Sequence, residues 1–353
     1  FSTDGLMSAA LMGVLKEKRL SIPEDISLVC FDDLDWMQFH EPTISAVVQP
    51  TREVGERAAR LVLDSYNTLD DAFGLMHAGR RFLAGAPWVY QDEIVMDRRT
   101  RKIPAGAVVE LQDPERQTLG LVAFNAESAI SARLLDADPG AEIDAAWLES
   151  RIAQALALRE RLFDKPFYRL VFGEGDLLPG LVVDRFGDVL VVQLNTLGME
   201  RLGEEIVAAL DKVLAPRAIV FKNDSSGRRQ EQLESHVEVV HGELPDQVLL
   251  EENGVRFAAP VVDGQKTGWF FDHRANRAWL NALVEGRRVL DLYSYVGGWG
   301  VQAAAHGAAE VLCVDRSGEA LERVAENAAL NAVGDRVAIG EADIFEALAS
   351  LKA

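Results

Sequence analysis

The stretch RVLDLYSYVGGWGVQAAAHGAAEVLCVD, residues 288–315, decides the fold of the C-terminal part of this chain. It predicts a strand over 288–292, a glycine-rich turn over 295–300, a helix over 301–306 and a second strand over 309–315. Residues 337–343 predict a third strand, and the strands carry acids at their ends, Asp291, Asp315 and Asp343. In a doubly wound parallel sheet these ends meet at one edge, where ligands bind. The sequence therefore predicts a ligand site at that edge.

The glycine spacing favours S-adenosylmethionine over a dinucleotide as the ligand. A dinucleotide site uses G-x-G-x-x-G, whereas this turn contains Gly297, Gly298 and Gly300. S-adenosylmethionine has no pyrophosphate to place on a helix N-terminus, and Asp291 can help to hold its ammonium group. Asp315 can accept hydrogen bonds from ribose hydroxyls. The alternative is a glycine-rich turn in an α/β domain that binds no ligand.

Length and charge narrow the class of protein. The chain has 353 residues, enough for two or three domains, and a net charge of -20, which argues against a general nucleic-acid coat protein. Local basic patches remain compatible with that charge. Cys30 and Cys313 lie far apart in apolar runs, so we predict neither a disulfide nor a metal site. We find no apolar run long enough for a membrane span and no signal peptide, so we expect a cytoplasmic protein without a membrane partner.

Residues 1–69 predict a helix that starts at Thr3 or Asp4, a buried strand over 26–31 and an amphipathic helix over 52–63. The motifs IPEDISLVCFDD, residues 22–33, and PTISAVVQP, residues 42–50, resemble the effector-binding core of LacI/GalR-type transcription regulators. The resemblance implies that Asp32 binds a sugar or purine effector. It covers only the last part of such a regulator, so we expect a partial periplasmic-binding-protein-like segment in which Asp32 is a solvated strand-end acid.

After a linker over 70–75, residues 76–140 predict a small β barrel. Short strands are expected over 107–111, 119–124 and 131–135, separated by turn residues. Arg80, Pro87-Trp88 and Asp113, together with residues 126–133, resemble a PUA-type RNA-binding domain. We therefore predict RNA contacts from Arg80 and Trp88. The basic run over 98–102 can contact phosphates, although such runs more often form a solvated turn.

Residues 150–260 predict a compact α+β domain. A helix over 149–163 precedes a hairpin of strands over 181–183 and 189–194, a helix over 199–214 and a strand over 218–221. The polar loop over 223–230 carries Arg228 and Arg229, for which we predict contacts with an RNA backbone.

Four motifs make residues 76–353 similar to a known enzyme family. They are GQKTGWFFDHRANR at 264–277, YSYVGGWG at 293–300, VDRS at 314–317, and Asn327 with Asn331. The chain resembles the class I ribosomal RNA methyltransferases of the large-subunit methyltransferase I type, which make 5-methylcytosine in 23S RNA. The resemblance implies an α/β multidomain protein in which a PUA-like barrel and the α+β domain precede a truncated Rossmann-like methyltransferase domain over 261–353.

The resemblance also implies the cofactor, S-adenosylmethionine, and the partner, 23S ribosomal RNA; a homodimer is left open. Asp291 and Gly297 would hold the methionine part, Asp315 the ribose, and Asp343 would lie beside the adenine amine. We predict cofactor contacts from Phe271, Asp291, Tyr295, Gly297, Gly298, Asp315 and Asp343.

The family's chemistry uses a cysteine thiolate that attacks C6 of an unstacked cytosine so that C5 can take the methyl group. The resemblance places that cysteine, and an Asp-Pro-Pro loop, beyond the fourth strand, and the sequence stops at Ala353 before both. We assign no catalytic residue and expect this chain to be inactive alone. The alternatives are a guanine-N7 ribosomal RNA methyltransferase with the same cofactor site, and a fragment of a sugar-responsive LacI-type regulator.

Overall fold

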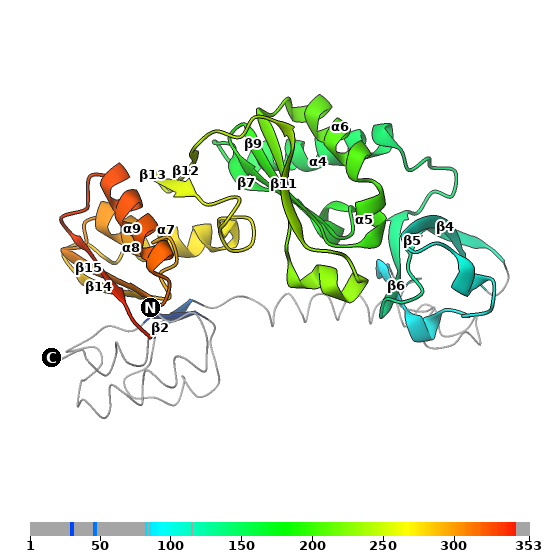
Figure 1. Cartoon of the computed structure of the whole chain (residues 1–353), viewed down its shortest axis with the longest axis horizontal. Helices are drawn as coiled ribbons and strands as arrows, with labels where there is room; N and C mark the ends of the chain where they lie inside the picture. Colours follow the sequence, from blue (N-terminus) through cyan, green and yellow to red (C-terminus); the bar gives the residue numbers. More distant parts are fainter. Residues whose placement is uncertain (1–28, 32–44, 48–81, 83–84, 114–115, 344–353) are drawn as a thin grey trace. The chain divides into compact units, whose positions relative to one another are not determined.

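The structure is a computed structural model that describes residues 29–31, 45–47, 82, 85–113 and 116–343 (Figure 1). The chain packs into two compact units, one formed by 1–57, 251–258 and 272–353, the other by 58–250 and 259–271. The sequence predicted a domain boundary at 260/261, whereas the chain passes from one unit to the other near residues 250, 258 and 271. In the regulator-like segment, β1 (Val29–Phe31) and β2 (Ser45–Val47) pair in parallel. Asp32 and Arg80 lie outside the described residues.

The PUA-like part of the larger unit is built on a four-stranded antiparallel sheet in the order β3-β6-β5-β4. Its strands are β3 (Trp88–Tyr90), β4 (Ala107–Gln112), β5 (Thr118–Phe124) and β6 (Ile130–Asp136). Val89, Val122 and Phe124 form its core. The strands predicted over 107–111, 119–124 and 131–135 are confirmed to within one residue. Two 3-10 turns, η2 (Gln91–Glu93) and η3 (Thr100–Lys102), connect β3 to β4.

The central part of the larger unit is a five-stranded mixed sheet in the order β11-β10-β9-β8-β7. The pairs are antiparallel except for β9 with β10, which run parallel. The strands are β7 (Phe167–Phe172), β8 (Leu181–Phe186), β9 (Val189–Leu194), β10 (Ala218–Asn223) and β11 (His236–Gly242). A two-residue turn joins β8 to β9, and Gly187 takes a φ of 67° there, as tight hairpins require.

Two helices, α4 (Ala145–Leu162) and α6 (Gly203–Leu214), pack with this sheet (Figure 1). The spacing of Leu148, Ile152 and Ala155 places these side chains on one face of α4, and all are buried in the core. The helix predicted over 199–214 is interrupted, because Leu202 leaves helical geometry between α5 (Leu197–Arg201) and α6. Two shorter 3-10 turns, η4 (Gly173–Asp176) and η5 (Ser226–Glu231), follow β7 and β10.

The smaller unit contains a three-stranded parallel sheet in the order β14-β15-β16 (Figure 1). It runs β14 (Arg288–Leu292), α8 (Gly300–Ala305), β15 (Glu310–Asp315), α9 (Gly318–Leu330) and β16 (Val337–Glu341). The strands predicted over 288–292, 309–315 and 337–343 are confirmed to within two residues. The register pairs Asp291 with Cys313 and Asp315 with Glu341. The carboxyl ends of the strands therefore share one edge, as predicted.

Ahead of this sheet, β12 (Val248–Glu252) and β13 (Val255–Ala259) form a two-stranded sheet at the point where the chain passes between the units. A 3-10 turn, η6 (Phe271–His273), then leads into α7 (Arg274–Asn281). No helix in the described ranges is long and apolar enough to cross a membrane.

Candidate functional site

Two strand-end acids fasten the glycine turn to the edge of the parallel sheet. Oδ2 of Asp291 accepts the backbone N–H of Gly300 at 2.8 Å, and Oδ2 of Asp315 accepts that of Tyr295 at 2.9 Å. The other oxygen of Asp315 accepts the N–H of Ser317 at 3.0 Å. Each carboxylate oxygen can accept more than one hydrogen bond. Asp315 therefore keeps acceptor capacity for a pair of ligand hydroxyls while it shapes the turn.

The turn leaves no room for side chains at two of its glycines. A Cβ at Gly300 would lie 2.4 Å from Sγ of Cys313 and 3.0 Å from Oδ2 of Asp291. A Cβ at Gly297 would lie 2.9 Å from a methyl group of Val301, and Gly297 also has a φ of 80°, which favours glycine. The backbone at Gly300 is thus pressed against β14 and β15, that at Gly297 packs against α8 and α9, and the start of α8 is fixed at the sheet edge.

Asp291 carries its charge in an almost dry position. The residue is 2% exposed. Burial raises the pKa of Asp291 to about 6, although the N–H of Gly300 and the charge of Arg277 both favour the ionised form. Keeping a buried carboxylate ionised costs free energy, and attraction to a nearby cation offsets that cost. The geometry suits a ligand that brings a positive charge to the turn.

Ser294 is a site residue that the sequence did not single out. It is buried in the segment that follows β14, and its Oγ has no hydrogen-bond partner in the described structure. Buried hydroxyls normally have a partner. An orphaned polar atom in the turn fits a ligand with polar groups, such as the amino acid and ribose parts of S-adenosylmethionine. Only the strained backbone around it, with Tyr293 and Tyr295 at positive φ, marks the position.

Asn327 joins the turn to a second element. Its Nδ2 donates to the carbonyl of Val296 at 2.9 Å, and its Oδ1 accepts the N–H of Ala258 on β13 at 2.8 Å. One turn along α9, Asn331 accepts from the N–H of Arg256 and donates to its carbonyl. The i, i+4 spacing of the two asparagines therefore lets both of them form hydrogen bonds with the backbone of β13.

A buried polar network supports the other side of the turn. Glu252 accepts from Arg277 at 2.6 Å and from Nε2 of Gln302 at 2.9 Å. The guanidinium of Arg277 also lies 5.6 Å from the ring centroid of Trp299 in the turn, and the ring of His273 packs 5.8 Å from the same centroid. The charge of Arg277 is thus matched by Glu252 and placed close to the glycine turn.

The structure brings most of the predicted cofactor residues together. Asp291, Asp315, the half-buried Tyr295 and the buried Gly297 and Gly298 all belong to the turn or its strand ends. Asp343 follows β16 by two residues at the same edge and is half-buried.

Phe271 belongs to the other unit. There its ring packs against Phe186, with centroids 5.3 Å apart.

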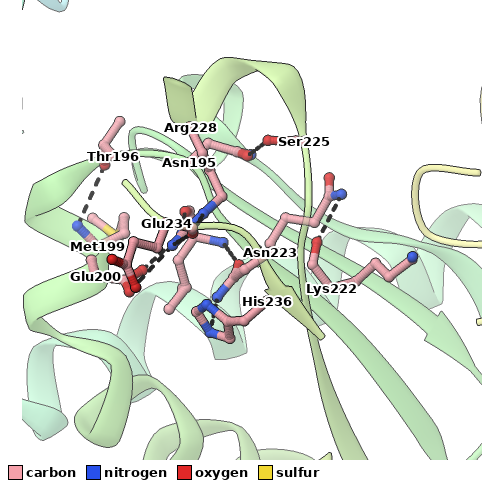
Figure 2. A network of polar contacts seen from close by, with 12 residues as sticks. Asn195, Thr196, Met199, Glu200, Lys222, Asn223, Ser225, Arg228, Glu234 and His236 are labelled. Atoms are coloured by element: carbon pink, nitrogen blue, oxygen red, sulfur yellow. Dashed lines mark hydrogen bonds and ion pairs between the residues drawn. The ribbon is translucent and has the colours of Figure 1, made fainter. Parts of the chain in front are cut away.

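Of the two arginines predicted to contact RNA in the loop over 223–230, one is buried and the other is exposed. Arg228 is 1% exposed and donates to the carbonyls of Leu194 and Glu234 and to the carboxylate of Glu200, the last at 2.8 Å (Figure 2). A contact between Arg228 and RNA would require those bonds to break, so this position gives it a structural role. Its neighbour Arg229 is exposed.

Trp88 is also engaged within its own unit. Its Nε1 donates to Glu174 at 2.8 Å, and Arg133 lies 6.0 Å from its ring centroid. The partly buried ring thus ties the PUA-like sheet to the central part of the unit, a role that the sequence prediction of an RNA contact did not foresee.

Cys313 does not have the properties of a nucleophile. It is fully buried on β15, and burial, together with the neighbouring charge of Asp291, raises its thiol pKa well above the usual value. The side chain of Cys30 lies outside the described part. Among the described residues, no group of three or more histidine, cysteine or acidic side chains is placed to hold a metal ion.

Comparison with known protein families confirms the predicted resemblances. A model of S-adenosylmethionine-dependent methyltransferases matches residues 169–353. A PUA-like domain matches residues 76–137, and a periplasmic binding protein-like domain matches residues 1–72.

Two curated relatives carry the name ribosomal RNA large subunit methyltransferase I. The protein of Shewanella frigidimarina is 38% identical over 267 residues, which cover 74% of this chain and 67% of that protein. The protein of Shigella boydii serotype 18 is 36% identical over 249 residues, which cover 69% of this chain and 62% of that protein. The chain therefore spans 62–67% of the length of these relatives.

Solved structures show the same fold. A protein from Streptococcus mutans, described as a SAM-dependent methyltransferase, superimposes with a TM-score of 0.65 at 22% identity, over 76% of this chain and 70% of that one. A second protein, described as a methyltransferase in complex with SAH, gives a TM-score of 0.66 at 21% identity, over 76% of this chain and 69% of that one.

Proposed function

This chain belongs to the S-adenosylmethionine-dependent methyltransferases, and we propose that it holds that cofactor at the carboxyl edge of β14, β15 and β16 to methylate ribosomal RNA. The observation that carries the proposal is the glycine turn fastened between Asp291 and Asp315. The turn combines a backbone without side chains, a buried negative charge and free acceptor capacity at one sheet edge. Those are the features that a cationic, ribose-bearing ligand requires.

Each part of the cofactor has a counterpart in the site. Asp291 attracts the ammonium group through its buried charge, and the methionine part lies against the backbone of Gly297 and Gly298. Asp315 accepts hydrogen bonds from the ribose hydroxyls, and Asp343 lies beside the adenine amine. Tyr295 lines the turn between these groups.

Cofactor binding is the first test. Calorimetric titration of the chain with S-adenosylmethionine should give saturable binding that Asp315→Ala abolishes. Asp335→Ala removes an exposed acid from the same unit and should leave the affinity unchanged, which controls for net charge. Equal affinities in the two variants would contradict the assignment of Asp315 to the ribose.

We propose 23S ribosomal RNA as the substrate and C5 of a cytosine as the position methylated. The names of the curated relatives support ribosomal RNA. C5 chemistry needs a thiolate, and the burial of Cys313 means that this residue does not supply it. Methylation of guanine N7, which needs no thiolate, is the second candidate.

Nucleoside mass spectrometry of 23S RNA after reaction with labelled cofactor separates 5-methylcytidine from 7-methylguanosine. The first product supports C5 methylation and the second supports the alternative. Labelled RNA containing neither nucleoside would reject both.

The match of residues 1–72 to a periplasmic binding protein-like domain favours a separate role for the N-terminal segment, as a fragment of a sugar-responsive regulator in which Asp32 binds the effector. A calorimetric screen of sugars against wild type and Asp32→Ala tests it, and an absence of binding to wild type would end this proposal. A cytoplasmic location and a homodimer stay predictions, and sedimentation would decide the second.

A further inference from the structure

A short turn on the PUA-like part carries the densest positive charge in the chain. Residues 97–102, here called the basic turn, contain one acid, Asp97, and four cations, Arg98, Arg99, Arg101 and Lys102. All four cationic residues are exposed, and the turn includes η3. Like charges this close repel one another, and a protein with 56 acidic residues against 36 lysines and arginines has many acids that could neutralise them. Within the described ranges, none of the four forms an ion pair.

The single acid of the basic turn is used to hold its backbone. Oδ1 of Asp97 accepts the N–H groups of Arg99 and Thr100, both at 2.7 Å, and the hydroxyl of Thr100 at 3.0 Å. The backbone N–H of Lys102 adds a bond to the carbonyl of Arg99 at 3.0 Å. The turn is therefore preorganised, so that a ligand which binds the four side chains has little backbone to order.

The segment that follows the basic turn, residues 105–106, is fixed to the central part of the same unit. Nε of Arg201 on α5 donates to the carbonyl of Ala105 at 2.7 Å. Gly106, with a φ of 78°, packs so closely on α5 that a Cβ would lie 2.6 Å from the carbonyl oxygen of Leu197. Arg201 is exposed and adds a fifth cation beside the turn. An exposed cation of the central part thus lies close to the segment that follows the basic turn.

We propose that the basic turn, with Arg201, is a docking surface for the phosphate backbone of RNA. The proposal rests on the ribosomal RNA substrate proposed above and names where that partner is held. Two of the four positions predicted to contact RNA, Trp88 and Arg228, are occupied by bonds within their own unit, whereas the cations of the basic turn are exposed and form no ion pair among the described residues. Arginine side chains on a rigid turn suit phosphates because their planar donors bind two oxygens at once.

The salt dependence of RNA binding measures this surface directly. Each phosphate that a cation neutralises releases bound counterions, and the plot of log affinity against log salt steepens by about 0.7–0.9 per contact. Replacing Arg98, Arg99, Arg101 and Lys102 with glutamine should therefore flatten that slope by about 3. Adding Arg201→Gln should flatten it by about 1 more.

The experiment uses the full chain and a fluorescently labelled RNA hairpin, with anisotropy measured from about 50 to about 200 mM KCl. The matched control removes four other exposed cations, through Arg161→Gln, Lys212→Gln, Arg217→Gln and Arg287→Gln. The control should keep the wild-type slope although its net charge is the same as that of the basic-turn variant. Circular dichroism and thermal melting of each variant confirm that both remain folded.

The outcomes separate this proposal from the proposed function. An equal slope change in both variants, or no RNA binding by wild type, would overturn the docking surface. Polyglutamate that competes as well as RNA at equal charge would also overturn it, because the turn would then bind any polyanion. A slope change confined to the basic-turn variant supports it whether or not a methyl group is transferred, so that the docking surface and the enzyme activity are tested separately.

Discussion

Replacing Asp291 with asparagine should stabilise the smaller unit while it weakens cofactor binding. Burial raises the pKa of this carboxyl from 3.8 to about 6. Each pKa unit corresponds to about 1.36 kcal/mol, so keeping Asp291 ionised at pH 7 costs the folded state about 3 kcal/mol. Asparagine is nearly isosteric and its Oδ1 can still accept the N–H of Gly300. We therefore expect a gain of about 1–3 kcal/mol in the free energy of unfolding at pH 7.

The pH dependence gives the sharper result. Because the folded state binds the proton more tightly than the unfolded chain, wild-type stability falls as the pH rises from 3.8 to about 6. The slope from this group is about 1.4 kcal/mol per pH unit and should be missing in Asp291→Asn. The two proteins should therefore be equally stable near pH 4 and differ most above pH 6. Urea-induced unfolding at a series of pH values measures the difference.

Cofactor affinity should move in the opposite direction. Loss of the charge should weaken S-adenosylmethionine binding about 10- to 150-fold at pH 7, the range expected for a hydrogen bond or contact that involves a charged group. Wild-type affinity should also fall below pH 6, as Asp291 becomes neutral. A variant that is less stable than wild type at pH 7, or a stability difference that does not change with pH, would refute the reasoning, because the bond from Gly300 would then outweigh the cost of burial.

Three further substitutions test the packing around the turn and in the central part. Gly300→Ala should abolish cofactor binding and cost about 2–4 kcal/mol of stability through overlap with Sγ, and Cys313→Ala in the same chain should restore part of the loss in a thermal melt. Asn327→Ala leaves a carbonyl and an N–H unpaired and should cost about 2–4 kcal/mol in urea unfolding, clearly more than Asn331→Ala at its partly exposed position. Arg228→Gln should destabilise the larger unit by about 3 kcal/mol without a change in the salt slope of RNA binding, whereas an RNA-contacting arginine would change that slope.

The fold of the smaller unit could be predicted because its signals are local. Apolar runs over 288–292 and 310–315 fix the strands, the glycines fix the turn, and the acids that follow fall at the sheet edge because parallel strands share a direction. The same reasoning located Asp291 and Asp315 correctly. It could not reveal that Asp291 is almost fully buried, since burial depends on how closely α8 approaches β15 at Gly300.

The roles of Arg228 and Trp88 could not be predicted because their partners are distant in sequence. An arginine in a polar loop looks exposed until the carbonyl of Leu194 and the carboxylate of Glu200 are brought to it by the sheet. The indole of Trp88 similarly depends on Glu174, which lies in another part of the unit. Ser294 gave no signal at all, because a missing hydrogen-bond partner is a property of the folded chain.

The two bonds of Asn327 have a mechanical consequence. At residue 258 the chain leaves the smaller unit for the larger one, and the N–H of Ala258 is held by Oδ1 of Asn327, whose amide also grips the glycine turn at Val296. Tension applied along the connecting chain therefore reaches the glycine turn directly through the side chain of Asn327. In a force spectroscopy experiment, bound cofactor should raise the force at which the hydrogen bonds of Asn327 break. Asn327→Ala should abolish this effect of the cofactor.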